Sequence, residues 1–167
     1  LLTLHCAIIT NPGAPSRNPE PGLLKSTIRK FFTSLEHIEA PGTLDGGDVM
    51  MVGKHFFIGL SERTNEEGAR QLIKILKKYE MTGSMIPLKD MLHLKTGLSY
   101  LENNNLLIYG EFLNKEEFSS FNQIVVDEDE AYAANSIWVN DTVIVPMGFP
   151  KTLKKIQDVG YRTLTVD

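Results

Sequence analysis

A pattern of two apolar strands, a helix and a third strand occurs three times in this chain, and it constrains the fold more than any other feature. Each copy opens with two apolar segments joined by a tight turn rich in Gly or Asn, which tolerate the positive φ of hairpin turns. The paired segments are residues 49–52 with 55–59, 98–101 with 106–110, and 136–139 with 142–146.

A helix is predicted after each of these hairpins. The first follows a capping box formed by Thr64 and Glu67. The second is a shorter helix over residues 114–121 with Asn114 as its cap. The third begins at Pro150 and ends at Gly160. Closing strands are expected over residues 84–88, 123–126 and 163–166.

The N-terminal segment resembles most of a further copy. Residues 4–10 are predicted as its strand and residues 11–19 as its loop. The apolar face of its helix is expected to comprise Leu24, Ile28, Phe31, Phe32 and Leu35.

The repeat predicts an α/β fold of ββαβ units, with about three to four units in a single domain over residues 1–167. Repeated units bury their open faces on their neighbours, around an axis or along a line. The uneven spacing of the copies favours a closed ring with insertions. In such a ring the loops after the strands converge on the axis, which would bring together Arg17, Asp45, Arg63 and His93.

Composition restricts the class of protein. The chain has 167 residues, 42% hydrophobic and 23% charged, as expected for a globular domain. The net charge is −4 with scattered Lys and Arg, which argues against nucleic-acid partners. No apolar run approaches a membrane span. One cysteine, Cys6, excludes an internal disulfide and fits the reducing cytoplasm.

His93 lies in the apolar run Leu92-His93-Leu94 and has two interpretations. A lone histidine on an apolar strand is ordinarily a core residue bonded to a carbonyl. A histidine in a partly desolvated loop can instead act as a general acid and base near neutral pH. The following Lys95-Thr96-Gly97 indicates a loop or strand end and favours the second interpretation.

Asp45 and Asp48 flank the Gly46-Gly47 turn. An Asp before Gly commonly bonds its own backbone. The alternative is that the glycines let the backbone approach a ligand that both carboxylates face. A metal would require further ligands at defined spacing, so no metal site is predicted. A guanidinium fits better, because a carboxylate accepts its planar fork of N–H groups.

Arg63 precedes a predicted helix and Arg17 lies in a Pro-rich loop. Each is either a solvated surface residue or a bidentate partner for a carboxylate. Cys6 is placed mid-strand beside His5. Strand neighbours point to opposite faces, so His5 is badly placed to activate Cys6, which is interpreted as a packing residue.

Four segments together resemble the bacterial dimethylarginine dimethylaminohydrolases of the guanidino-group-modifying, or arginine deiminase, superfamily. They are residues 40–50 (APGTLDGGDVM), 59–65 (GLSERTN), 92–98 (LHLKTGL) and 135–140 (NSIWVN). The resemblance implies a five-bladed α/β propeller of ββαβ units, the pentein fold, here incomplete at both ends.

The resemblance also implies roles for single residues. His93 matches the general acid/base and Asp45 the active-site carboxylate. Arg63 and Arg17 match arginines that hold the substrate's α-carboxylate and the nearby loop, and Asp48 is assigned to substrate binding with them. A family segment of substrate contacts is expected before Leu1, and the nucleophilic cysteine after Asp167.

The implied activity is hydrolysis of a methylarginine to citrulline and a methylamine through a covalent thiouronium, without a cofactor. An arginine deiminase is the nearest alternative, although Lys95 favours the methylarginine branch. A guanidino-binding protein without catalysis is a second alternative. The 167 residues alone are expected to be inactive. A missing blade leaves a strand edge unpaired, so self-association, a homodimer included, is expected.

Overall fold

The computed structural model describes residues 1–167 and has an α/β fold. The chain forms two compact units, Leu1–Leu88 and Lys89–Asp167. The single domain expected over residues 1–167 stays a prediction beside this division.

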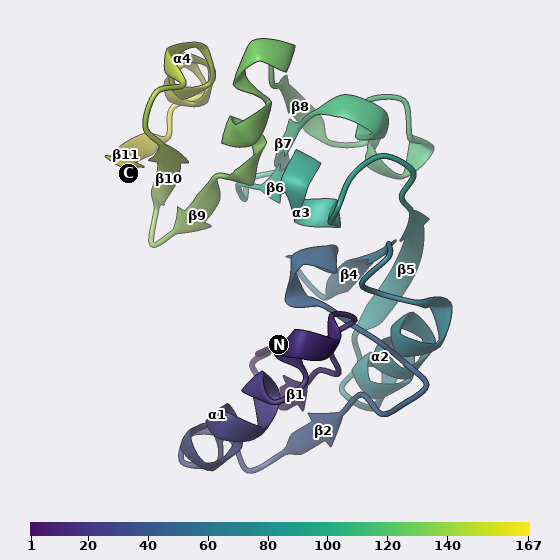
Figure 1. Cartoon of the computed structure of the whole chain (residues 1–167). Helices are drawn as coiled ribbons and strands as arrows, with labels where there is room; N and C mark the ends of the chain where they lie inside the picture. The colour runs from purple at the N-terminus through teal and green to yellow at the C-terminus, as the bar shows by residue number, and fades with distance from the viewer. The chain divides into compact units, whose positions relative to one another are not determined.

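The first unit opens with a two-stranded parallel sheet and continues with a three-stranded one (Figure 1). Strands β1 (Ala7–Ile9) and β2 (Leu35–His37) pair in parallel, connected through the 3-10 helix η1 (Pro15–Arg17) and helix α1 (Glu20–Ile28). The second sheet follows η2 (Gly46–Asp48) and has the order β3-β4-β5. Its elements are β3 (Val49–Val52), β4 (His55–Leu60), α2 (Glu66–Lys78) and β5 (Thr82–Pro87).

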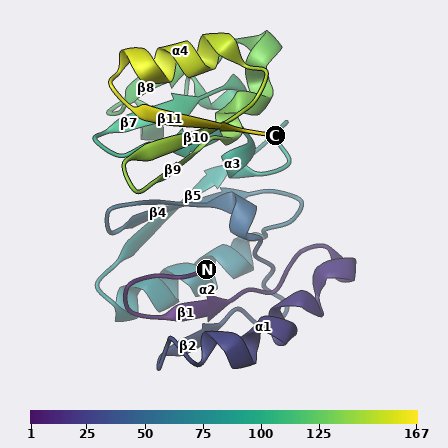
Figure 2. The ribbon, with the colours of Figure 1, turned by 90° about the vertical axis from the view of Figure 1, so that its left-hand side faces the viewer.

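The second unit contains two three-stranded sheets with the same connectivity. The first follows helix α3 (Leu94–Gly97), and its elements are β6 (Leu98–Tyr100), β7 (Asn105–Ile108), η3 (Gly110–Phe112), η4 (Glu116–Phe118) and β8 (Asn122–Val125). The second follows η5 (Glu128–Asn135), and its elements are β9 (Ile137–Val139), β10 (Thr142–Pro146), α4 (Pro150–Asp158) and β11 (Arg162–Val166). Figure 2 shows α4 running alongside β10 and β11.

These three sheets confirm the repeat that the sequence predicts. In each, the middle strand is antiparallel to the strand before it and parallel to the strand after it. Positive φ values occur at Gly53, Asn103, Asn104, Asn140 and Asp141, as the predicted turns require.

The helix predicted over residues 114–121 is wrong. This region holds the short 3-10 helix η4, preceded by η3. Phe112 and Phe118 are both fully buried, and their rings pack edge to face with their centroids 6.1 Å apart. Phe112 lies before the predicted helix and Phe118 within it, and the two 3-10 turns bring their rings into contact.

The predicted cap of α2 also differs. Asn65, not Thr64, is the N-cap, and its side chain accepts the N–H of Gly68 at 2.8 Å. Thr64 is instead fully buried, and its hydroxyl donates a hydrogen bond to the Asp48 carboxylate.

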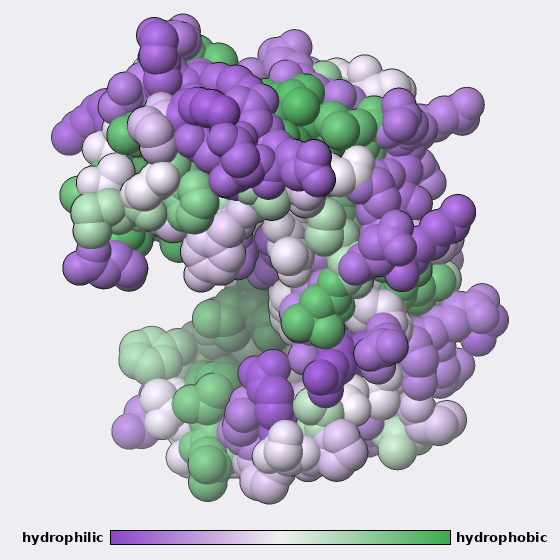
Figure 3. All heavy atoms as spheres, turned by 45° about the horizontal axis from the view of Figure 1, so that its top comes forward, coloured by the Kyte–Doolittle hydropathy of each residue, from purple (hydrophilic) through white to green (hydrophobic).

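The N-terminal copy is only partly as predicted. Its strand is shorter, and Leu35 belongs to β2 because that strand is drawn into the parallel ladder with β1. The predicted helix face is not buried within the described residues: Phe31 is 78% exposed and Leu24 57%. Figure 3 shows such hydrophobic residues, in green, at the surface among hydrophilic ones.

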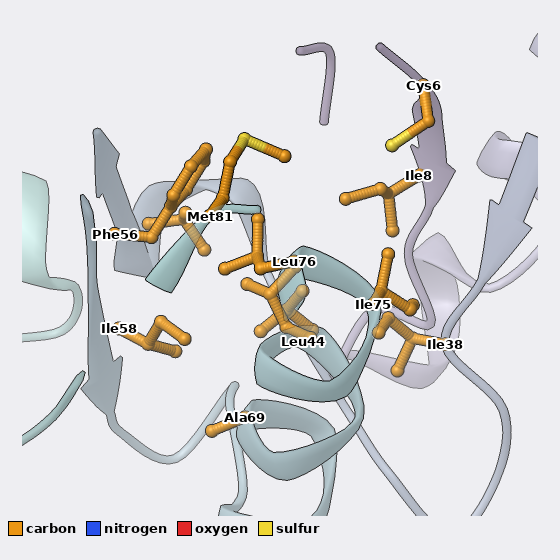
Figure 4. Packing of buried hydrophobic residues seen from close by; sticks show 12 residues of the cluster. Cys6, Ile8, Ile38, Leu44, Phe56, Ile58, Ala69, Ile75, Leu76 and Met81 are labelled. Atoms are coloured by element: carbon orange, nitrogen blue, oxygen red, sulfur yellow. The ribbon is translucent and has the colours of Figure 1, made fainter. Parts of the chain in front are cut away.

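The core of the first unit lies where α2 packs on β1 and β4 (Figure 4). Leu72 and Leu76 of α2 are completely buried, each contributing about 1.5–3 kcal/mol to stability. The second unit buries its own cluster, comprising Leu101, Leu107, Ile124, Val126, Ala134, Val143, Val145 and Ile156. None of the helices is both long and apolar enough to cross a membrane.

Candidate functional site

The Gly46-Gly47 turn forms the 3-10 helix η2, and both of its carboxylates turn into the first unit. Asp45 is 3% exposed and Asp48 fully buried. A buried carboxylate requires hydrogen-bond donors or a counter-charge, and both residues have them.

Asp45 ties the Pro-rich loop to the turn. Its Oδ1 accepts the backbone N–H of Gly13 at 3.0 Å, and its Oδ2 accepts Nη1 of Arg17 at 3.2 Å. The same guanidinium donates Nε and Nη2 to the carboxylate of Glu20 at 3.0–3.2 Å. Hydrogen bonding to Glu20, and then the charges of Glu20 and Asp45, raise the pKa of Arg17. Arg17 is therefore a fixed cation between two carboxylates.

Asp48 organises the turn between β4 and α2. Its Oδ2 accepts the hydroxyls of Ser61 and Thr64, each at 2.7 Å. The Thr64 hydroxyl in turn accepts the N–H of Asp45 at 3.0 Å. The Ser61 hydroxyl accepts the N–H of Arg63 at 3.0 Å. Asp48 thus fixes the turn that carries Arg63.

The loop and this turn also meet through their backbones. Gly13 packs so closely on Arg63 that a Cβ at position 13 would collide with the Arg63 carbonyl. Only glycine fits such an approach, which is why the Arg17 loop and the Arg63 turn share one place in the first unit.

His93 lies in the second unit, at the N-cap position of α3. Its backbone is extended, with φ −143° and ψ 156°, and its carbonyl accepts the N–H of Thr96 at 3.1 Å. The side chain is half-buried. His93 is therefore at a loop-to-helix junction and not in the centre of a strand, the setting that the Lys95-Thr96-Gly97 sequence favoured.

The structure thus brings together Arg17, Asp45, Asp48 and Arg63 through one network in the first unit. The meeting of His93 with that network stays a prediction. Cys6 is fully buried with its Sγ 3.5 Å from the Thr3 hydroxyl, which confirms its packing role. It directly precedes β1 and is not mid-strand, which corrects its predicted placement.

Sequence reasoning missed the groups that hold this network. Glu20 follows Arg17 by three positions, a spacing that by itself indicates an ion pair on a helical turn. The roles of Ser61 and Thr64 had no such signal, since a Ser or Thr near a helix start is ordinarily read as a cap.

Comparison with known proteins decides the family. The family model described as arginine deiminase matches residues 25–155. This chain belongs to the arginine deiminase family. The resemblance found in the sequence is thereby confirmed.

Two curated members of the family are close relatives of the whole chain. It is 56% identical to the N(G),N(G)-dimethylarginine dimethylaminohydrolase of Pseudomonas aeruginosa, over 100% of this chain and 66% of that protein. It is 28% identical to the enzyme of the same name from Streptomyces coelicolor, over 98% of this chain and 62% of that protein. The chain thus spans just under two thirds of the length of these relatives.

Solved structures of similar proteins have the same fold as this chain. A cysteine-to-serine variant of DDAH from Pseudomonas aeruginosa, complexed with citrulline, superposes with a TM-score of 0.99 at 56% identity, covering 100% of this chain and 66% of that one. The N-terminal domain of the arginine dihydrolase ArgZ gives 0.86 at 19% identity over 99% of this chain and 64% of that one, a likeness of fold alone.

Proposed function

We propose that the protein hydrolyses Nω-methylated arginines to citrulline and a methylamine. The observation that carries this proposal is the 56% identity, over the whole of this chain, to a dimethylarginine dimethylaminohydrolase. The citrulline bound to the structurally similar Pseudomonas aeruginosa variant supports the same product.

Asp45 and Asp48 are proposed to bind the substrate guanidinium, and Arg63 and Arg17 its carboxylate. Asp45 already accepts a guanidinium N–H, that of Arg17, so its position suits such a partner. Arg17 is held by Glu20 and Asp45, so it would bind the substrate as a pre-oriented cation. The fold proposed for the full-length protein is a five-bladed α/β propeller of ββαβ units.

The nucleophile is proposed to be a cysteine outside these 167 residues, since Cys6 is buried in the core of the first unit. Its thiolate would attack the guanidinium carbon while His93 protonates the departing dimethylamine, which leaves a covalent thiouronium. His93 would then deprotonate water. Attack of that hydroxide releases citrulline and restores the thiolate, so atoms and charge balance without a cofactor.

The test is a product assay on the full-length protein that contains this sequence. Nω,Nω-dimethylarginine should give citrulline and dimethylamine in equal amounts. The family model that matches the chain is described as arginine deiminase, which makes that activity the alternative. Preferred turnover of arginine with release of ammonia would replace the proposal by that alternative. Binding of both compounds without turnover would support a guanidino-binding protein.

His93 can be tested in the same protein. The variant His93→Ala should bind substrate but lose the turnover that proton transfer provides. Wild-type rates in this variant would remove His93 from the mechanism.

A further inference from the structure

The carboxylate of Glu111 in η3 accepts hydrogen bonds from three consecutive backbone N–H groups of the segment that leads into His93. Its Oε1 accepts the N–H groups of Lys89, Asp90 and Met91 at 3.2, 3.0 and 3.0 Å. Its Oε2 also accepts the N–H of Lys89, at 3.0 Å. Met91 is only two positions before His93.

The ionised form of Glu111 suits this task. Burial alone would raise its pKa, but the three backbone N–H groups together lower it, so the carboxylate stays charged. Bonds from N–H groups to an ionised oxygen are about twice as strong as neutral ones. The segment 89–91 is therefore held by a charged anchor.

Gly110 sets the position of that anchor. It has φ +65°, a conformation that favours glycine, and a Cβ there would lie 2.6 Å from the end of Met91. The chain can therefore place Glu111 directly against the 89–91 segment without a side chain between them.

The other flank of His93 is held by the same small element. Helix α3 begins directly after His93 and ends at Gly97, where a Cβ would lie 2.8 Å from the ring of Phe112. The carbonyl of Gly97 accepts the N–H of Tyr109 at 2.9 Å. Residues 109–112 thus fix the backbone both before and after His93.

We propose that Glu111 is a positioning residue that aims the His93 imidazole for proton transfer. This inference rests on the proposed function, in which His93 protonates the leaving amine. A displacement of about 1 Å in a reacting group can cost about a hundredfold in rate. An anchor two residues from His93 can prevent such a displacement without touching the substrate.

The alternative is that Glu111 only stabilises the second unit, and the chain offers a matched control for it. Glu130 in the same unit is a buried carboxylate that likewise accepts consecutive backbone N–H groups, those of Lys151 and Thr152. Its carboxylate bonds helix α4 and none of residues 89–91. Loss of either anchor should lower stability, but only loss of Glu111 should misplace His93.

The experiment compares Glu111→Ala, Glu111→Gln and Glu130→Gln in the full-length protein, assayed well below their melting temperatures. Glu111→Ala should lower kcat about ten- to hundredfold with KM changed less than about threefold. It should also shift the limb of the pH–rate profile that reports His93. Glu111→Gln keeps one acceptor oxygen and should lose less. Glu130→Gln should lose stability but keep kcat within about twofold of the wild type.

Two outcomes would overturn the inference. One is a kcat in Glu111→Ala as high as in Glu130→Gln. The other, decisive if Glu111→Ala does not fold, is unchanged NMR signals of the 89–91 amides and the His93 imidazole in Glu111→Gln. The NMR measurement needs no turnover, so it separates failure of this inference from failure of the proposed function, which the product assay would show.

Discussion

Replacing Glu130 by Ala should destabilise the second unit through helix α4. This helix begins at Pro150, which has no N–H, after an N-cap residue whose side chain makes no capping bond. Glu130 caps it from a distant part of the chain, with Oε1 3.0 Å from the N of Lys151 and Oε2 2.6 Å from the N of Thr152.

The expected loss is about 3 kcal/mol. Thr152 is fully buried, so leaving its N–H without an acceptor costs about 1–3 kcal/mol. Lys151 is exposed, so water can replace part of its bond. Because the acceptor is an ionised carboxylate, whose hydrogen bonds contribute about 1.5–3 kcal/mol, the loss lies at the upper end of this range. For a chain of this size, the melting temperature should fall by about 6–12 °C.

Differential scanning calorimetry and urea unfolding would measure this loss, with Asp129→Ala as the control. Asp129 directly precedes Glu130, and its carboxylate accepts a hydrogen bond from Nζ of Lys151, but that pair is exposed to solvent. Its removal should leave the melting temperature unchanged. Equal melting temperatures for the two variants, or unchanged amide exchange in α4 of Glu130→Ala, would refute the reasoning.

The pH dependence provides a second check on Glu130. Burial acts to raise its pKa, but hydrogen bonds from Lys151 and Thr152 bring the pKa below its ordinary value. A lowered folded-state pKa means that the contribution is present above the unfolded value of about 4.3 and is lost as the pH falls through the folded value. The stability difference between wild type and Glu130→Ala should thus persist from pH 8 to 5 and shrink below about pH 4.

Three further changes test other parts of the structure. In the full-length protein, His93→Ala should lower the citrulline-forming rate by about two to four orders of magnitude with little change in unfolding temperature. Cys6→Ser should retain turnover in the same assay. Loss of turnover in this variant would show that Cys6 is the nucleophile. Gly68→Ala in α2 would ordinarily stabilise a helix by about 0.5–1 kcal/mol. Here it should lower the unfolding midpoint, because the new methyl group would press on the Thr43 carbonyl.

The repeat was predictable because it depends on sequence patterns that span only a few residues. Alternating apolar segments, turn residues such as Asn140 and the Pro150 helix start each act over a few positions, and the structure follows them. The prediction failed where distant packing decides. The joint burial of Phe112 and Phe118 replaces a helix by short turns, and pairing with β1 draws Leu35 into a strand.

The residues of the network around Asp45 and Asp48 were recognisable from the sequence more than the bonds that connect them. The Gly-Gly turn and the two loop arginines were recognisable by type, and the structure joins them in one network. The links run through Ser61, Thr64 and Glu20, whose roles depend on which segments meet in space. Sequence spacing does not contain that information for residues far apart, and the same holds for Glu111.

Each three-stranded sheet is built from strands that are consecutive in the chain, and this has a consequence for folding during synthesis. All strands of the β3-β4-β5 sheet lie within residues 49–87, and its parallel pairing is bridged by α2 alone. Pairings between nearby residues have a small loop-closure cost and form quickly. During synthesis, this sheet therefore has all of its strands as soon as residue 87 leaves the ribosome. It can begin to fold while the β9-β10-β11 segment has yet to be translated.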